Sequence, residues 1–183
     1  FRSFQIGRGR IVLRAKVDAV AREVLHLLAG EFAAFASGSN SASLAPSANI
    51  TSNCNISVKT DIAFGAYDPL DGAVVSTTGA LTVACTSDVS NPVITLGQGS
   101  HADSGSTNAA PLRRLASSGH FLSYGLYQDS SDTVWGNTSQ TGATFDNSAG
   151  DGLGHDVTVY AKIAANQHSA PAGSYSDTVT ATI

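Results

Sequence analysis

Residues 175–183 read YSDTVTATI, and this closing stretch holds the clearest strand pattern in the chain. Apart from Asp177, its odd-numbered residues are apolar, and its even-numbered residues are all Ser or Thr. Successive side chains of a β-strand point to opposite faces, so the alternation predicts a strand with one face on a core and the other in solvent. Because the pattern runs to the last residue, we expect no later strand to pair with its free edge.

Short runs of the same kind recur through the preceding residues. Turns rich in Gly, Ser, Asn and Asp separate them, as at 97–99, 129–132 and 150–154. The runs predict seven strands, at 44–50, 57–64, 80–85, 92–96, 121–127, 157–163 and 177–183. Seven short strands at this spacing favour an all-β, immunoglobulin-like sandwich. We interpret Trp135 as a core residue and Tyr175 as a corner aromatic.

Composition and charge agree with such a body and argue against nucleic-acid binding. Only 13% of the 183 residues are charged, and 18 are Gly. Residues 1–36 hold six basic and three acidic residues, whereas residues 37–183 hold four basic and eleven acidic ones. Phosphates need a concentrated positive face, which this acidic body lacks. Only Arg113 and Arg114 adjoin in it, either as a solvated pair or with one bound to a carboxylate.

The first 41 residues are expected to form a leader or extension of their own. Residues 17–36 show helical spacing of apolar side chains, and 37–41 have the composition of a linker. A small-x-small motif at 34–36 resembles a signal cleavage site, but His26 and Glu31 interrupt the apolar stretch before it. A retained signal, a wrongly assigned leader and a real N-terminal helix all fit this pattern. No run is long and apolar enough to span a membrane.

The two cysteines are Cys54 and Cys85, and both lie in strand-like runs. Two free buried thiols are one interpretation. A disulfide is favoured because the surrounding sequence is rich in Ser, Thr and Asn, poor in Lys and free of Met, as in secreted proteins. Closing this loop would stabilise the fold by about 3–4 kcal/mol in the chain-entropy model.

We expect the protein not to be an enzyme, with no catalytic, cofactor-binding or metal-binding residues. The sequence lacks the Gly-x-Ser-x-Gly motif of many hydrolases, and its five histidines lack the paired spacing of zinc sites. The segment 146–152 has the oxygen-rich composition of a calcium loop. It lacks the carboxylate expected at the twelfth position, where Val157 stands.

Several short motifs, in order, carry a resemblance to a known family. They are CNIS (54–57), AFGAYD (63–68), TGALTVACT (78–86), LRRL (112–115), LSYGLYQD (122–129), VWG (134–136), VYAKI (159–163) and AGSYSDTV (172–179). Together they cover about 140 residues, and the chain resembles the spore-coat-protein-U-like domain of archaic chaperone–usher pilins.

The resemblance implies an incomplete immunoglobulin-like domain, at 53–183, that lacks one edge strand. A periplasmic chaperone lends a strand during transport, and the extension of a neighbouring subunit replaces it in the fibre. An unpaired edge invites such strand addition. The implied partners are identical or related pilins, the chaperone and an outer-membrane usher, with no nucleic acid. The implied location is an extracellular, cell-surface pilus reached through the periplasm.

The resemblance places the donor strand directly before the first cysteine, at 42–52, with Leu44, Pro46, Ala48 and Ile50 on one face. Pro46 removes one ladder hydrogen bond, which an edge strand tolerates. An ordinary first strand of the same domain is the alternative, and residues 11–17 also alternate. The accepting edge would be the closing strand, through the side chains on its apolar face, Val179, Ala181 and Ile183.

The function expected from these observations is that of a structural pilus subunit assembled by donor-strand complementation through a chaperone–usher pathway. A secreted carbohydrate-binding adhesin-type module is the alternative. Such a module needs an exposed aromatic platform, and the sequence contains one Trp.

Overall fold

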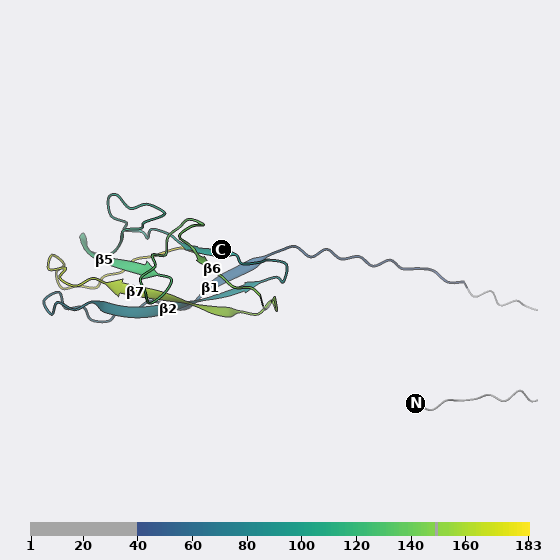
Figure 1. Cartoon of the computed structure of the whole chain (residues 1–183), viewed down its shortest axis with the longest axis horizontal. Helices are drawn as coiled ribbons and strands as arrows, with labels where there is room; N and C mark the ends of the chain where they lie inside the picture. Colours follow the sequence, from purple (N-terminus) through teal and green to yellow (C-terminus); the bar gives the residue numbers. More distant parts are fainter. Residues whose placement is uncertain (1–39, 149) are drawn as a thin grey trace, which may run out of the picture. The chain divides into compact units, whose positions relative to one another are not determined.

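The computed structural model describes residues 40–148 and 150–183, and every regular element in them is a β-strand (Figure 1). The compact unit Ala48–Ile183 contains all of these strands. They are β1 (Cys54–Thr60), β2 (Val75–Cys85), β3 (Val93–Leu96), β4 (Arg113–Ser117), β5 (His120–Tyr127), β6 (Ala143–Thr144), β7 (His155–Ile163) and β8 (Ala181–Thr182). No helix able to cross a membrane occurs among the described residues.

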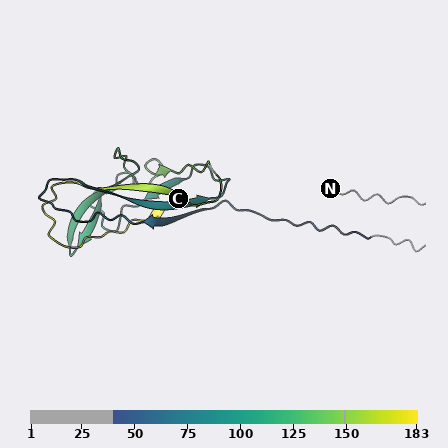
Figure 2. The ribbon, with the colours of Figure 1, turned by 90° about the horizontal axis from the view of Figure 1, so that it is seen from below.

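The strands form two antiparallel sheets. One has the order β1-β2-β7-β5-β4 and the other the order β6-β3-β8. Figure 1 labels β1, β2, β5, β6 and β7, and Figure 2 shows the ribbon after a turn of 90°. The central pair, β2 and β7, is in register from Val75 opposite Ile163 to Val83 opposite His155. The core holds residues of both sheets, including Leu81 and Leu126 from the first and Ile94 and Leu96 from the second. The predicted all-β, immunoglobulin-like sandwich is therefore confirmed.

The alternation in the sequence explains which side chains form the core. In β2, Leu81, Val83 and Cys85 are buried, whereas the residues between them are half exposed. Strand β7 repeats the pattern with Val159, Ala161 and Ile163. Each strand thus buries every second side chain, as the pleat requires.

Two aromatic residues play the roles that we inferred from the sequence. Trp135 is fully buried, and its indole nitrogen donates a 2.8 Å hydrogen bond to the carbonyl oxygen of Ile94. The Tyr175 hydroxyl donates to the carbonyl oxygen of Pro171, four residues upstream, at 2.8 Å. This second bond has the form of the tyrosine corner found in immunoglobulin-like domains.

The strand boundaries differ from the prediction in several places. Strand β1 begins three residues and ends four residues before the predicted 57–64, and β2 begins five residues before the predicted 80–85. Residues 44–50 form no strand, and residues 40–53 are exposed throughout. The closing strand is limited to β8, because loop residues pair with the stretch before it: the Ser100 amide donates to Thr178 and the Gly97 amide to Thr180. Strands β4 and β6 were not predicted from the sequence. Strand β4 begins with two arginines, and β6 is too short to show a periodic pattern.

Candidate functional site

An open groove in the body lies between β1 with the segment after it and β8 with the segment before it. It consists of two adjoining clefts. The strand cleft, of about 360 Å³, is lined mainly by strand residues such as Val58, Leu81, Leu126 and Val159. The loop cleft, of about 820 Å³, lies between residues 62–70 and 170–177, with Leu122 and Ile163 among its lining. We call the two clefts together the edge groove.

The edge groove opens onto the hydrophobic core of the sandwich. Val58 and Thr60 of β1 line one side of the strand cleft, and Val179 and Ala181 line the other. Within the described residues, β1 pairs only with β2, and β8 pairs only with β3. Each sheet therefore ends at this groove with one strand edge that no described strand covers. Such edges pair readily with an added strand.

Three side chains in contact with one another line the groove where its two clefts adjoin. The Phe64 and Tyr124 rings meet edge to face, with centroids 5.9 Å apart. The Tyr124 hydroxyl in turn donates a 2.7 Å hydrogen bond to Asp177 Oδ2. Phe64 follows β1, Tyr124 lies in β5, and Asp177 precedes β8. We call these three residues the crossbar. Phe64 and Asp177 line both clefts, as do Ile62 and Leu115.

The Asp177 carboxylate is buried, its side chain being only 1% exposed. Besides Tyr124, it accepts a 2.9 Å hydrogen bond from the Ser100 amide and lies 3.2 Å from His101 Nδ1. Burial, followed by the hydrogen bond to Asp177, raises the pKa of Tyr124 above its ordinary value, so the phenol stays protonated. The crossbar is therefore tied to β5 and to the loop after β3.

Arg113 supports the loop next to the crossbar from inside the sandwich. Its guanidinium is buried and donates 2.8 Å hydrogen bonds to the carbonyl oxygens of Leu96, Gly97 and Trp135. Burial lowers its pKa to about 10, against smaller opposing effects from Tyr124 and Asp177. The interpretation that Arg113 and Arg114 form a solvated pair is therefore wrong for Arg113. Its neighbour Arg114 does pair with a carboxylate, that of Asp103, at 2.9 Å.

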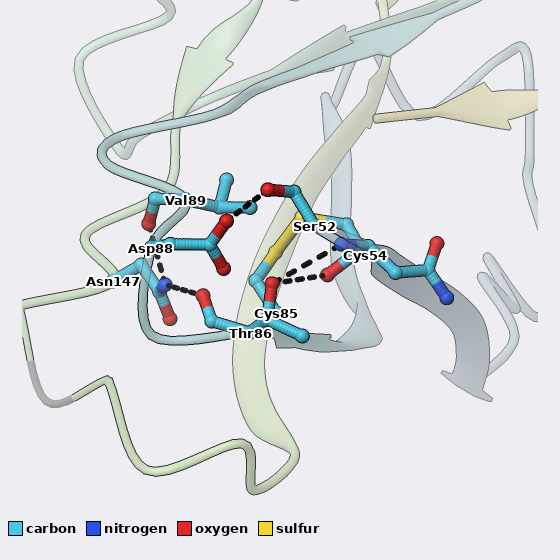
Figure 3. The surroundings of a disulfide bond; sticks show 8 residues. Ser52, Cys54, Cys85, Thr86, Asp88, Val89 and Asn147 are labelled. Atoms are coloured by element: carbon cyan, nitrogen blue, oxygen red, sulfur yellow. Dashed lines mark hydrogen bonds between the residues drawn. A yellow bond between two sulfur atoms is a disulfide. The ribbon is translucent and has the colours of Figure 1, made fainter. Parts of the chain in front are cut away.

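The segment preceding β1 joins the body at a disulfide bond between Cys54 and Cys85 (Figure 3). The disulfide that the sequence favoured is thus present, and its two residues lie directly opposite each other in β1 and β2. Neighbouring hydrogen bonds fasten the same place: the Thr86 amide donates to the Asn53 carbonyl at 2.9 Å, and the Ser52 hydroxyl bonds the Asp88 carboxylate. That bond from Ser52 is the main cause of a lowered pKa at Asp88.

The predicted donor residues are exposed, whereas the predicted acceptor residues are half-buried. Leu44 is 95% exposed and Ile50 86% exposed, and neither belongs to a strand. By contrast, Val179, Ala181 and Ile183 are half-buried and pack against the core. The alternative donor at 11–17 and the proposed helix at 17–36 lie outside the described residues. The crossbar was not predicted from the sequence. The signal for it was Asp177, the one residue that interrupts the apolar face of the closing stretch.

Comparison with known proteins decides the family. A family profile for the Spore Coat Protein U domain matches residues 40–182. The chain belongs to the Spore Coat Protein U family. The match includes residues 42–52, so the family domain begins before Cys54. A related protein, Protein U of Myxococcus xanthus, is 47% identical over 128 residues, which are 66% of this chain and 69% of that protein. The resemblance inferred from the motifs is therefore confirmed at the level of this family.

A similar solved structure comes from a pilus system. It is the crystal structure of the CsuC–CsuE chaperone–tip adhesion subunit pre-assembly complex from the archaic chaperone–usher Csu pili of Acinetobacter baumannii. The likeness has a TM-score of 0.48 at 20% sequence identity and covers 73% of this chain. The part of the solved chain that matches this protein is 39% of the length of that solved chain.

Proposed function

We propose that the protein is a non-enzymatic structural subunit of a bacterial surface pilus, assembled by donor-strand complementation. Residues 42–52 of one copy would enter the edge groove of the next and pair with its open strand edges. Before assembly, a periplasmic chaperone would fill the groove, and an outer-membrane usher would deliver the subunit to the extracellular fibre. Membership of the Spore Coat Protein U family and a disulfide suited to an oxidising compartment support this proposal.

The observation that carries the proposal is the presence of both halves of a strand exchange in one chain. The body has a groove lined by core side chains, with two strand edges that no described strand covers, and the segment before the body has exposed apolar residues at alternate positions. Burying a Leu and an Ile side chain contributes roughly 3–6 kcal/mol, and backbone hydrogen bonds add to this. When the segment of one copy enters the groove of the next, the apolar residues of both are buried. Repeating this exchange from copy to copy produces a linear polymer.

The carbohydrate-binding alternative receives less support. Its natural platform, the single Trp, is Trp135, which is fully buried in the core.

Assembly of the full-length chain tests the proposal. Leu44→Asp with Ile50→Asp would place two charges in the groove, so we expect the purified double variant to stay monomeric while the wild-type chain forms filaments visible by electron microscopy. Ser47→Asp with Asn49→Asp adds the same charges on the opposite face of the segment and should leave filaments intact. Filaments of the Leu44/Ile50 variant indistinguishable from wild type would refute donation by residues 42–52.

A further inference from the structure

Besides the edge groove, the body has a cleft on the outer face of its larger sheet. Gly125 and Tyr127 of β5 line this cleft, and they alternate with the buried residues of that strand. Lys162 of β7 lies opposite Gly125 in the sheet and lines the cleft as well. Its volume of about 450 Å³ is within the range of small-molecule sites. We call it the outer cleft.

The outer cleft is bordered by an aromatic ring that lies against the backbone of its own strand. A Cβ added at Gly125 would lie only 2.3 Å from the Tyr127 hydroxyl oxygen and 2.5 Å from Tyr127 Cζ. The phenol end of the ring therefore occupies the place that a side chain at Gly125 would take. Because Gly125 leaves this place open, Tyr127 lies along β5, half-buried, and gives the cleft an aromatic surface.

Aliphatic side chains continue this surface on the same side of the sheet. Leu112 and Val134 are exposed, and both line the outer cleft. Val134 forms a β-bridge with Tyr127, and the Gln128 amide donates a 2.9 Å hydrogen bond to the Thr133 carbonyl. The turn between these residues is thus closed by backbone hydrogen bonds. The cleft is therefore formed before a ligand enters it, which lowers the entropic cost of binding.

Charged side chains border the outer cleft and limit the charge of its ligand. The Lys162 ammonium pairs with Asp132, and Arg114 pairs with Asp103 at 2.9 Å. Both carboxylates line the cleft and are about half exposed, so each has lone pairs available to a hydroxyl donor. Arg113 also lines the cleft, but its guanidinium is bonded to backbone carbonyls inside the sandwich. Two carboxylates beside one ammonium favour a neutral ligand over an anionic one.

We propose that the outer cleft binds a neutral saccharide. One face of a pyranose ring carries C–H groups, which suit the electron-rich face of the Tyr127 ring. The hydroxyl groups at the edge of the sugar can bond the Asp132 carboxylate and the Lys162 ammonium. That ammonium lies 5.9 Å from the centroid of the Tyr127 ring, so that one sugar unit reaches both. The aromatic surface is thus supplied by Tyr127 and not by the buried Trp135.

This binding would be an additional property of the subunit and does not depend on strand exchange. The outer cleft lies on the outer face of the larger sheet, whereas the edge groove opens onto the core. A donor strand in the edge groove would therefore leave the outer cleft accessible along the fibre.

Saturation-transfer difference NMR on the full-length chain tests the site, because the method detects weak ligands of monomers and filaments alike. The probes are the methyl glycosides of glucose, galactose, mannose and N-acetylglucosamine, with methyl glucuronide as the anionic comparison. We expect transfer to at least one neutral probe, strongest at the C–H protons on one face of the sugar ring. Transfer to the glucuronide should be weaker.

Two substitutions and a matched control assign the signal to the outer cleft. Tyr127→Ala removes the aromatic surface, and Gly125→Ala displaces the ring, so each should weaken binding about tenfold. Tyr160→Ala should leave binding unchanged, because Tyr160 lies opposite Tyr127 in β7 but does not line the cleft. Circular dichroism checks folding, and Gly125→Ala decides the result even where Tyr127→Ala does not fold.

Three results would each overturn the proposal. They are transfer to none of the neutral probes, equal transfer in the wild type and Gly125→Ala, and stronger transfer to the glucuronide than to every neutral probe. Filament formation by the same samples is read separately by electron microscopy, so failure of the saccharide site and failure of the proposed function are distinguishable.

Discussion

The Tyr124 hydroxyl donates a 2.7 Å hydrogen bond to the buried carboxylate of Asp177 and thereby links β5 of the larger sheet to the chain segment that leads into β8. The two residues are 53 positions apart in the sequence. The bond crosses from one sheet to the other next to the open groove, where neither β1 nor β8 has a second partner strand within the described residues. It therefore adds a side-chain link to the groove wall, beside the backbone pairing of Ser176 with Ala116 of β4 and of Thr178 with Ser100.

Removing this bond should destabilise the body. Tyr124→Phe leaves the carboxylate without one donor, and a hydrogen bond to a charged group contributes about 1.5–3 kcal/mol. We expect the free energy of unfolding, measured by urea denaturation, to fall by this amount. Tyr127→Phe, in the same strand, serves as the control and should change stability little. A Tyr124→Phe variant as stable as the wild type would contradict the assigned role.

The same tyrosine should make stability fall in strong alkali. Its pKa is raised in the folded state, whereas an unfolded tyrosine ionises near pH 10. Above about pH 10 the unfolded chain loses this proton and the folded chain keeps it, so the free energy of unfolding decreases as pH rises. The stability difference between wild type and Tyr124→Phe should therefore shrink between pH 9 and 11. A constant difference over that range would argue against a raised pKa.

Two glycines allow the crowding around Asp177 to be measured. Gly99 and Gly105 have nearly equal positive φ angles, 85° and 86°, but an added Cβ would meet Asp177 at Gly99 and nothing within 4 Å at Gly105. Alanine at either position incurs a left-handed backbone cost of about 1–2 kcal/mol. We expect Gly99→Ala to lower the melting temperature clearly further than Gly105→Ala. Equal decreases in melting temperature would show that the Asp177 side chain can move to make room for an added Cβ at Gly99.

Opening the disulfide should destabilise the domain by about 3–4 kcal/mol in the chain-entropy model. The comparison is between the wild-type chain and the double variant Cys54→Ala, Cys85→Ala, each with and without dithiothreitol, by chemical denaturation. The reductant should act on the wild type alone. A wild-type stability that is indifferent to complete reduction would contradict a stabilising disulfide.

A charge on the inner face of the accepting segment should block strand entry. Val179 lines the strand cleft and is half-buried, whereas the adjacent Thr180 is exposed. We expect Val179→Asp to weaken binding of a synthetic 42–52 peptide at least tenfold and Thr180→Asp to leave it nearly unchanged. Circular dichroism checks that both variants fold. Equal binding to both would exclude this wall from the acceptor site.

Periodicity in the sequence was sufficient for the parts of the fold that depend on burial. Alternation located β5 and β7 to within two residues and the second half of β2, and the composition around Cys54 and Cys85 pointed to their disulfide. These features are local, because each apolar side chain reports its own burial. The family motifs then placed the strands in a common fold.

The crossbar and the support from Arg113 depend on partners that are distant in the sequence. Arg113 is buried because three backbone carbonyls from two other segments converge on its guanidinium, and nothing in LRRL (112–115) indicates them. The groove likewise arises where two sheets fail to close, which strand patterns do not reveal. Asp177 was the one visible sign, since a carboxylate on an apolar face requires buried donors.

The position of the disulfide determines how the body responds to mechanical tension. A pull on residues 40–53 reaches the body at Cys54, the first residue of β1, and the covalent bridge passes it directly to Cys85 of β2. Strand β2 is hydrogen-bonded along both edges, to β1 and to β7. The force therefore need not travel through β1, an outermost strand that could be peeled away. Under such a pull, β1 would keep its place as one side of the groove.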